Sequence, residues 1–248
     1  MLAGQTILIT GGASGIGLAT CKHLLSCGAN VALWDVDSTQ IEQAVTALNV
    51  PEDRCRGFSV DVTDVSQIEA AFKETLAAFG DVHGAFNNAG IGSATLPLAD
   101  TSEEDFDRVV AVDLKGVWLC MKQELLHFRE HGGAIVNNAS VAGLVALAGQ
   151  AAYVASKHGV IGLTKTAAVE YATTNVRVNA VCPGAVRTPI LSHLEEAGVD
   201  ESALSGMAPM ARIGDPDEIA KAVAWLLSDE ASFVTGTSMS IDGGWAAQ

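Results

Sequence analysis

Three residues in the middle of the sequence have the types and spacing to move a proton together: Ser140, Tyr153 and Lys157. Tyr153 and Lys157 are four residues apart in a segment that predicts a helix, so the phenol and the ammonium share one helical face. Ser140 follows the apolar run 134–136, which predicts a strand, and stands at its carboxyl end. A hydroxyl, a phenol and an amine facing one crevice indicate general acid–base chemistry.

A glycine-rich loop near the N-terminus predicts a dinucleotide-binding site. It follows the predicted strand 5–10 and opens a predicted helix, which is the context that gives such a loop meaning. Gly11 permits the tight turn, Gly15 lets backbone N–H groups approach a pyrophosphate, and Gly17 lets helix and strand pack closely. The alternative is a glycine turn that serves packing alone. The candidate cofactor-binding residues of the loop are Gly11, Ser14, Gly15, Ile16 and Gly17.

Asp35 predicts which dinucleotide binds. It ends the predicted strand 29–34, about 20 residues after the glycine loop, where a ribose-binding acid is expected. A carboxylate there accepts hydrogen bonds from the ribose hydroxyls of NAD and repels a 2′-phosphate. No arginine or lysine stands beside it. The sequence therefore predicts NAD(H) rather than NADP(H), with an ordinary turn aspartate as the alternative.

Short apolar strands alternate with helices along the whole chain. This pattern predicts an α/β fold: a single domain over residues 1–248, a doubly wound parallel sheet of Rossmann-like type with helices on both faces. Segment 184–211 lacks clear periodicity and is expected to be a substrate loop. Helix starts are predicted at Asp64 with Gln67, at Thr101 with Glu104, and at Asp215 followed by Pro216. The remaining expected strands are 56–60, 83–86, 177–181 and 238–241, and the expected helices include 38–48, 64–79, one from 101 to about 129, and one that carries Tyr153 to about 174.

Composition excludes several classes of function. With 14 basic and 29 acidic residues the chain has a formal charge of −15, so long-range repulsion disfavours nucleic acid and anionic membranes as partners. The five cysteines are scattered and the six histidines form no metal-binding pattern, so we expect neither a disulfide framework nor a metal. No leader-like or membrane-spanning run is evident. These features favour a soluble protein of the cytoplasm.

Taken together with Asn87-Asn88-Ala89-Gly90, these motifs make the chain resemble the short-chain dehydrogenases/reductases, in their compact single-domain branch. The resemblance runs from Thr10 to Asp242-Gly243. It implies that Tyr153 is the general acid/base, that Ser140 holds the substrate oxygen, and that Lys157 binds the nicotinamide ribose and lowers the tyrosine pKa. It also implies a homotetramer. The further cofactor-binding residues that it implies are Asp61, Val62, Asn88, Ala89, Gly90, Pro183, Gly184, Val186 and Thr188.

One position departs from the family pattern. The family has a fourth catalytic residue, an asparagine on the long helix, and the matching residue here is Asp113. An aspartate loses the amide donor and can add a negative charge near Lys157, which would raise the lysine pKa and weaken its effect on Tyr153. The other interpretation is a tolerated substitution that leaves the proton relay intact.

The expected substrate is a neutral, fairly apolar secondary alcohol or its ketone, and a cyclic or aromatic compound is one option. Arg187 is the one strong cation near the expected lining apart from Arg212, so a polyanionic substrate is disfavoured. A 3-oxoacyl-carrier-protein reductase is an alternative, and a non-catalytic nucleotide-binding scaffold or redox sensor is a second. The expected apolar lining residues are Ile91, Leu96, Leu144, Leu147, Ile190, Leu191, Leu194, Met207 and Met210, with His193 as a polar candidate.

Overall fold

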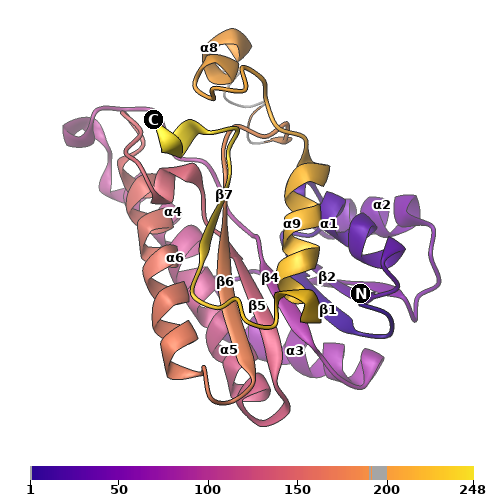
Figure 1. The fold of residues 1–248 in the computed structure, drawn as a ribbon. Helices are drawn as coiled ribbons and strands as arrows, with labels where there is room; N and C mark the ends of the chain where they lie inside the picture. The colour runs from indigo at the N-terminus through magenta and orange to yellow at the C-terminus, as the bar shows by residue number, and fades with distance from the viewer. Residues whose placement is uncertain (1, 190, 192–199) are drawn as a thin grey trace.

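The computed structural model describes residues 2–189, 191 and 200–248. Its centre is one sheet of seven parallel strands in the order β3-β2-β1-β4-β5-β6-β7 (Figure 1). The predicted fold class is therefore confirmed. The order reverses between β1 and β4, and in sheets of this kind ligands bind where the order reverses, beyond the carboxyl ends of the strands. The strands are β1 (Thr6–Thr10), β2 (Asn30–Asp35), β3 (Cys55–Ser59), β4 (Gly84–Asn87), β5 (Gly133–Asn138), β6 (Val176–Pro183) and β7 (Ser238–Ile241).

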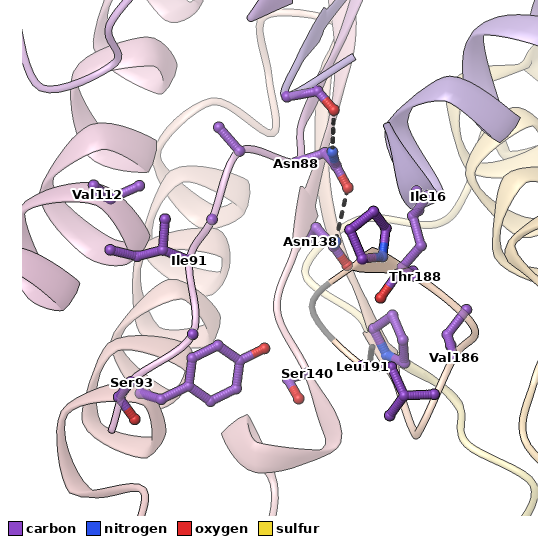
Figure 2. Close-up of a pocket in the computed structure, with 18 of the residues that line it drawn as sticks. Ile16, Asn88, Ile91, Ser93, Val112, Asn138, Ser140, Val186, Thr188 and Leu191 are labelled. Carbon is purple, nitrogen blue, oxygen red and sulfur yellow. Dashed lines mark hydrogen bonds between the residues drawn. The ribbon is translucent and has the colours of Figure 1, made fainter. Parts of the chain in front are cut away.

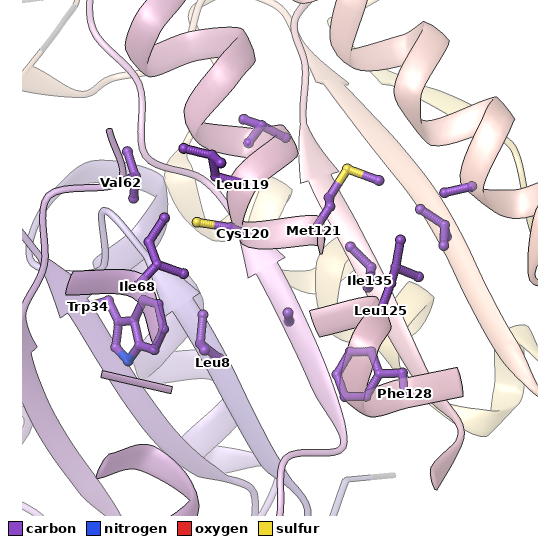
Figure 3. Close-up of a cluster of buried hydrophobic side chains, with 14 of the residues drawn as sticks. Leu8, Trp34, Val62, Ile68, Leu119, Cys120, Met121, Leu125, Phe128 and Ile135 are labelled. Carbon is purple, nitrogen blue, oxygen red and sulfur yellow. The ribbon is translucent and has the colours of Figure 1, made fainter. Parts of the chain in front are cut away.

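Helices cover both faces of this sheet, and each face has its own apolar core. Side chains of α1 (Gly15–Ser26), α2 (Ser38–Leu48) and α9 (Pro216–Leu227) pack with one set of strand residues. Side chains of α3 (Val65–Phe79), α5 (Val117–His131) and α6 (Ala151–Glu170) pack with the other set. Figure 3 shows part of the second core, in which Ile68, Leu119 and Leu125 lie against the strands. Because both faces are covered, β1 is buried at every position.

Several helix starts follow the predicted capping chemistry. Asp215 caps α9 in a full capping box with Glu218, and Pro216 occupies its first turn. Asp64 caps α3 as predicted, but the Gln67 side chain does not complete the expected capping box. Gln67 accepts a hydrogen bond from the Asp61 N–H instead of that of Asp64, which donates to the Asp61 carbonyl in a tight turn.

The predicted helix from Thr101 to about residue 129 needs two corrections. Its first segment, α4 (Glu103–Val110), is capped by Ser102, because the short turn Leu98–Asp100 that precedes it ends on Thr101. The helix then passes through a π-helical turn, Ala111–Gly116, before α5 begins. Such a turn inserts a residue into the helical repeat and often marks a functional site.

Two smaller differences concern ends of elements. The helix that carries Tyr153 ends at Glu170, and a turn closed by the Thr174 hydroxyl on the Tyr171 carbonyl replaces its predicted last residues. The expected substrate loop holds a short helix, α8 (Glu201–Gly206), in its described part. Ile190, His193 and Leu194 lie outside the described residues. No described helix is long and apolar enough to cross a membrane.

Candidate active site

A large cavity lies at the carboxyl ends of the strands, and it joins the glycine loop to the Ser140–Tyr153 region. Its volume is about 1600 Å³, enough for a dinucleotide and a small substrate. Asp35, Ser140 and Tyr153 line it together. In Figure 2, Asn88, Asn138 and Ser140 lie between Ile91 and Val112 on one side and Thr188 and Leu191 on the other. Residues that the sequence predicts and that line this cavity are Gly11, Ser14, Gly15, Ile16, Asp61, Val62, Asn88, Ala89, Gly90, Pro183, Gly184, Val186 and Thr188.

The glycine loop is packed so tightly that some positions admit only glycine. A Cβ on Gly17 would stand 2.0 Å from the Gly11 carbonyl oxygen and 2.7 Å from the Asn88 Nδ2. Gly17 is absent from the cavity lining, which agrees with the packing role that its place in the motif predicts. Gly11 and Gly15 have φ values of 61° and 51°, in the left-handed region that favours glycine. The loop thus leaves open the space that the pyrophosphate of a dinucleotide would need.

Asp35 is held at the end of β2 by the loop that it faces. One carboxylate oxygen accepts from the Ala13 N–H at 3.0 Å and the other from the Asp37 N–H at 3.3 Å. An ionised carboxylate has about four acceptor positions, so both oxygens retain capacity for ribose hydroxyls. Asp37 and Gln40 also line the cavity here. These residues fit an adenosine ribose, and Asp37 is one that the sequence did not single out.

The strand ends are linked by a chain of asparagines. The Thr10 hydroxyl accepts from the backbone N–H groups of Asn88 and Ala89, each at 3.0 Å. The Asn138 side chain donates to the Asn88 Oδ1 at 2.9 Å, and its backbone carbonyl accepts from the Lys157 Nζ at 3.2 Å. Asn138 was not predicted as a site residue. The signal for it was its position at the end of a predicted strand, two residues before Ser140.

Lys157 and Asp113 form a buried ion pair. The Lys157 Nζ lies 3.1 Å from the Asp113 Oδ2, and the two side chains are 4% and 0% exposed. The other Asp113 oxygen accepts from the Ile91 N–H at 2.8 Å, so the π-helical turn is tied to the loop after β4. Burial disfavours the lysine charge, but Asp113 and Tyr153 outweigh it, so the pKa of Lys157 is raised.

The ammonium of Lys157 also lies close to the Tyr153 ring. It lies 5.3 Å from the centre of the Tyr153 ring, on the same helix, as the four-residue spacing predicts. Ser140 is buried at the start of the short turn Val141–Gly143, which follows β5, and its hydroxyl oxygen accepts from the Ala142 N–H at 3.1 Å. A Cβ on Gly90 would stand 3.2 Å from the Asp113 Oδ2 and 3.4 Å from the Lys157 Nζ, so only a small residue suits this place. The structure thus brings together all four predicted catalytic residues.

The apolar end of the cavity differs in part from the expected one. Ile91, Leu147, Leu191 and Met207 line it as predicted. Leu96, Leu144 and Met210 do not, because their side chains are 41%, 37% and 66% exposed and face solvent instead. Arg187 pairs with Glu201 outside the lining, whereas Arg108, which the sequence did not single out, lines the cavity with Asp105. In the described residues, no cluster of histidine, cysteine and carboxylate side chains could hold a metal.

A doubly wound parallel sheet, a glycine loop opening α1, and a serine–tyrosine–lysine group at the strand ends define a nucleotide-dependent oxidoreductase. The comparisons with known proteins agree. The family described as "Enoyl-(Acyl carrier protein) reductase" matches residues 11–246. The chain belongs to the short-chain dehydrogenase/reductase family, whose members bind a nicotinamide cofactor.

Similar proteins share almost the full length of the chain. The 2,5-dichloro-2,5-cyclohexadiene-1,4-diol dehydrogenase of Sphingobium indicum is 45% identical, over 99% of this chain and 98% of that one. The cyclohexanol dehydrogenase of an Acinetobacter strain is 38% identical, over 98% and 96%. The crystal structure of levodione reductase superposes with a TM-score of 0.95 at 39% identity, covering 100% of this chain and 99% of that one.

Solved relatives carry either nucleotide. A 3-ketoacyl-(acyl-carrier-protein) reductase from Brucella melitensis is complexed with NADH, at 32% identity and a TM-score of 0.92 over 99% and 100% of the two chains. ElxO has NADP bound, with the same identity and TM-score over 98% and 99%. The family alone therefore leaves the choice between NAD and NADP to the residues of this chain.

Proposed function

We propose that this protein is an NAD(H)-dependent dehydrogenase that interconverts a neutral, fairly apolar cyclic secondary alcohol and its ketone. The observation that carries the proposal is that Ser140, Tyr153 and Asp35 line a single cavity. The names of the relatives support a cyclic substrate, since two of them specify a six-membered ring. The apolar lining residues Leu147, Leu191 and Met207 suit such a ring.

The proposed roles follow from the positions of the four side chains. Tyr153 exchanges a proton with the substrate oxygen, and Ser140 holds that oxygen by a hydrogen bond. Lys157 stabilises the phenolate by its charge and presents its remaining N–H donor to the nicotinamide ribose. Asp113 holds Lys157 in place through their 3.1 Å contact. When bound, NAD⁺ would accept the hydride in oxidation and NADH would supply it in reduction.

The cofactor is proposed to be NAD(H). Asp35 and Asp37 both line the adenosine end of the cavity. Among the described lining residues the basic one is Arg108, and its guanidinium is bonded to the Gly92 carbonyl and to Asp105, beside the loop that follows β4. A 2′-phosphate would therefore meet two carboxylates without a cation to balance its charge.

The test is a panel of cyclic and acyclic secondary alcohols, each with NAD⁺ and with NADP⁺, followed at the absorbance band of the reduced nicotinamide. We expect turnover of cyclic alcohols, with NAD⁺ preferred by at least about tenfold, a factor that corresponds to about 1.4 kcal/mol. Asp35→Ser should weaken that preference. Turnover with NADP⁺ alone would refute the cofactor assignment, and turnover of no alcohol or ketone would refute the function.

A 3-oxoacyl-thioester reductase is the second candidate, because a relative of that activity superposes closely. The net charge of −15 disfavours it, since an acyl carrier protein is itself acidic. A 3-oxoacyl thioester included in the same panel with NADH decides between the two.

Two further proposals concern the setting of the enzyme. We propose a homotetramer, as in related enzymes, and sedimentation equilibrium measures its mass. All five cysteines are free thiols and four of them are buried, which suits the reducing cytoplasm that we propose as its location.

A further inference from the structure

The C-terminal turn contributes a side chain to the cavity. Trp245 opens the short turn Trp245–Ala247, which three residues separate from β7, and its half-buried side chain lines the same cavity as Ser140 and Tyr153. Among the described lining residues, Tyr153 and Trp245 are the two aromatic ones. In Figure 1 the C-terminal turn lies at the end of the sheet where the chain also carries α8. No role in the reaction proposed above uses this indole.

On one side, the turn is fixed to the cofactor segment, residues 183–188, which the sequence predicts to bind the cofactor. The Gly184 N–H donates to the Ile241 carbonyl at 3.1 Å, and a Cβ on Gly184 would stand 2.9 Å from the Asp242 Cα. One Asp242 carboxylate oxygen accepts from the Gly244 N–H at 3.0 Å and the other from the Ala246 N–H at 2.8 Å. Asp242 therefore holds the backbone on both sides of Trp245.

The same turn is fixed on the side of the substrate loop. The Gln248 side chain donates to the Met207 carbonyl at 3.0 Å, and the Met210 N–H donates to the Gly243 carbonyl at 3.1 Å. Gly244 has a φ of 90°, and a Cβ there would stand 3.3 Å from the Pro209 ring. The backbone that carries Trp245 thus bridges the cofactor segment and the end of the substrate loop.

We propose that Trp245 is a specificity-determining residue that presents its indole to a flat, partly unsaturated ring in the substrate. An indole contributes a rigid apolar surface, and aromatic or olefinic rings gain from its face or edge in a way that a flexible chain does not. Leu191, Leu204 and Met207, which line the same cavity, are apolar but not aromatic. This inference rests on the proposed function, because it names the substrate class of that same site.

The kinetic test compares cyclohex-2-enone with the acyclic ketone hexan-2-one, both reduced with NADH. Trp245→Ala should lower kcat/KM for the ring ketone about tenfold more than for the acyclic one, through KM rather than kcat, since the indole takes no part in the chemical step. Trp245→Phe should restore most of the difference. Trp118→Ala is the matched control, because Trp118 is 44% exposed on α5 and outside the cavity. Equal losses for both ketones in Trp245→Ala would overturn the proposal.

A second readout does not depend on turnover. Cyclohex-2-enone quenches indole fluorescence on contact, so wild type with NAD⁺, which cannot reduce the ketone, should show a saturable quench that Trp245→Phe loses and Trp118→Phe keeps. A quench that is the same in wild type and Trp245→Phe would overturn the inference. If wild type reduces no ketone at all while the saturable quench at Trp245 remains, the proposed function fails and the ring-binding inference stands.

Discussion

At the scale of single residues, the Asp113–Lys157 pair decides how much charge reaches the phenol. A carboxylate 3.1 Å from the ammonium cancels part of the field that would stabilise the Tyr153 phenolate. Asp113→Asn keeps the acceptor for the Ile91 N–H and removes the negative charge. We expect the pH of half-maximal kcat/KM for alcohol oxidation to fall by about one unit, with a severalfold gain in rate at pH 7.

The measurement is a full pH–rate profile for wild type and variant. Asp107→Asn is the control, because Asp107 is exposed on α4 and its charge is remote from the buried pair. If both variants keep the wild-type profile, Asp113 acts as a spacer and its charge has no part in the rate.

A second buried carboxyl governs stability rather than catalysis. Glu124 on α5 is 1% exposed, and burial raises its pKa to about 8, although the hydrogen bond from the Asn87 amide opposes that shift. The folded protein therefore holds this proton to a higher pH than the unfolded chain, in which the pKa is about 4.3. It follows that the free energy of unfolding falls as pH rises from about 4 to 8 and levels off above.

Urea unfolding at pH 5.5 and pH 9 tests this. Glu124→Gln should remove a loss of a few kcal/mol between the two pH values and be more stable than wild type at pH 9. Glu130→Gln, on the exposed side of the same helix, should leave the loss unchanged. A pH dependence that Glu124→Gln does not alter would refute the assignment.

At the scale of elements, the close contact of α1 with the glycine loop sets the cofactor end of the cavity. Gly17→Ala places a methyl group 2.0 Å from the Gly11 carbonyl oxygen, so helix and loop must separate. We expect a loss of about 1–3 kcal/mol in the free energy of unfolding and at least about tenfold weaker NADH binding. Calorimetry of folding and of binding measures both.

Gly162→Ala in α6 is the matched control. Nothing lies within 4 Å of the added methyl group, and alanine favours a helix over glycine by about 0.5–1 kcal/mol. This variant should be slightly more stable and bind NADH as wild type does. Equal behaviour of the two variants would show that the Gly17 contact is unimportant.

Elements with strong local signals could be predicted from the sequence, and irregular ones could not. Asp215 caps α9 as the sequence predicts, and α2 begins at the predicted Ser38. The π-helical turn at Ala111–Gly116 has no such local signal, and Asp113 within it contacts Ile91 and Lys157, which are distant in the sequence. The start at Ser102 was likewise displaced by the turn before it.

At the scale of the whole molecule, the sheet order brings distant segments to one edge. Gly11, Asn88 and Ser140 could be predicted because each follows a strand, and parallel strands present their carboxyl ends together. Tyr153 and Lys157 could be predicted from their four-residue spacing on one helix. Arg108 and Trp245 could not be assigned in this way, since their places depend on how the segments outside the sheet pack after it forms. The exposure of Leu96 and Leu144 to solvent could not be predicted for the same reason.

The account rests on proton exchange at the Tyr153 oxygen, and the most direct test is Tyr153→Phe, with kcat and the NADH dissociation constant measured on the same preparation. We predict that kcat for a cyclic secondary alcohol falls by about 10²–10⁴ while NADH binding stays within about threefold of wild type. Tyr171→Phe, at the other tyrosine of the chain, should leave both unchanged. Undiminished turnover in Tyr153→Phe would contradict the account.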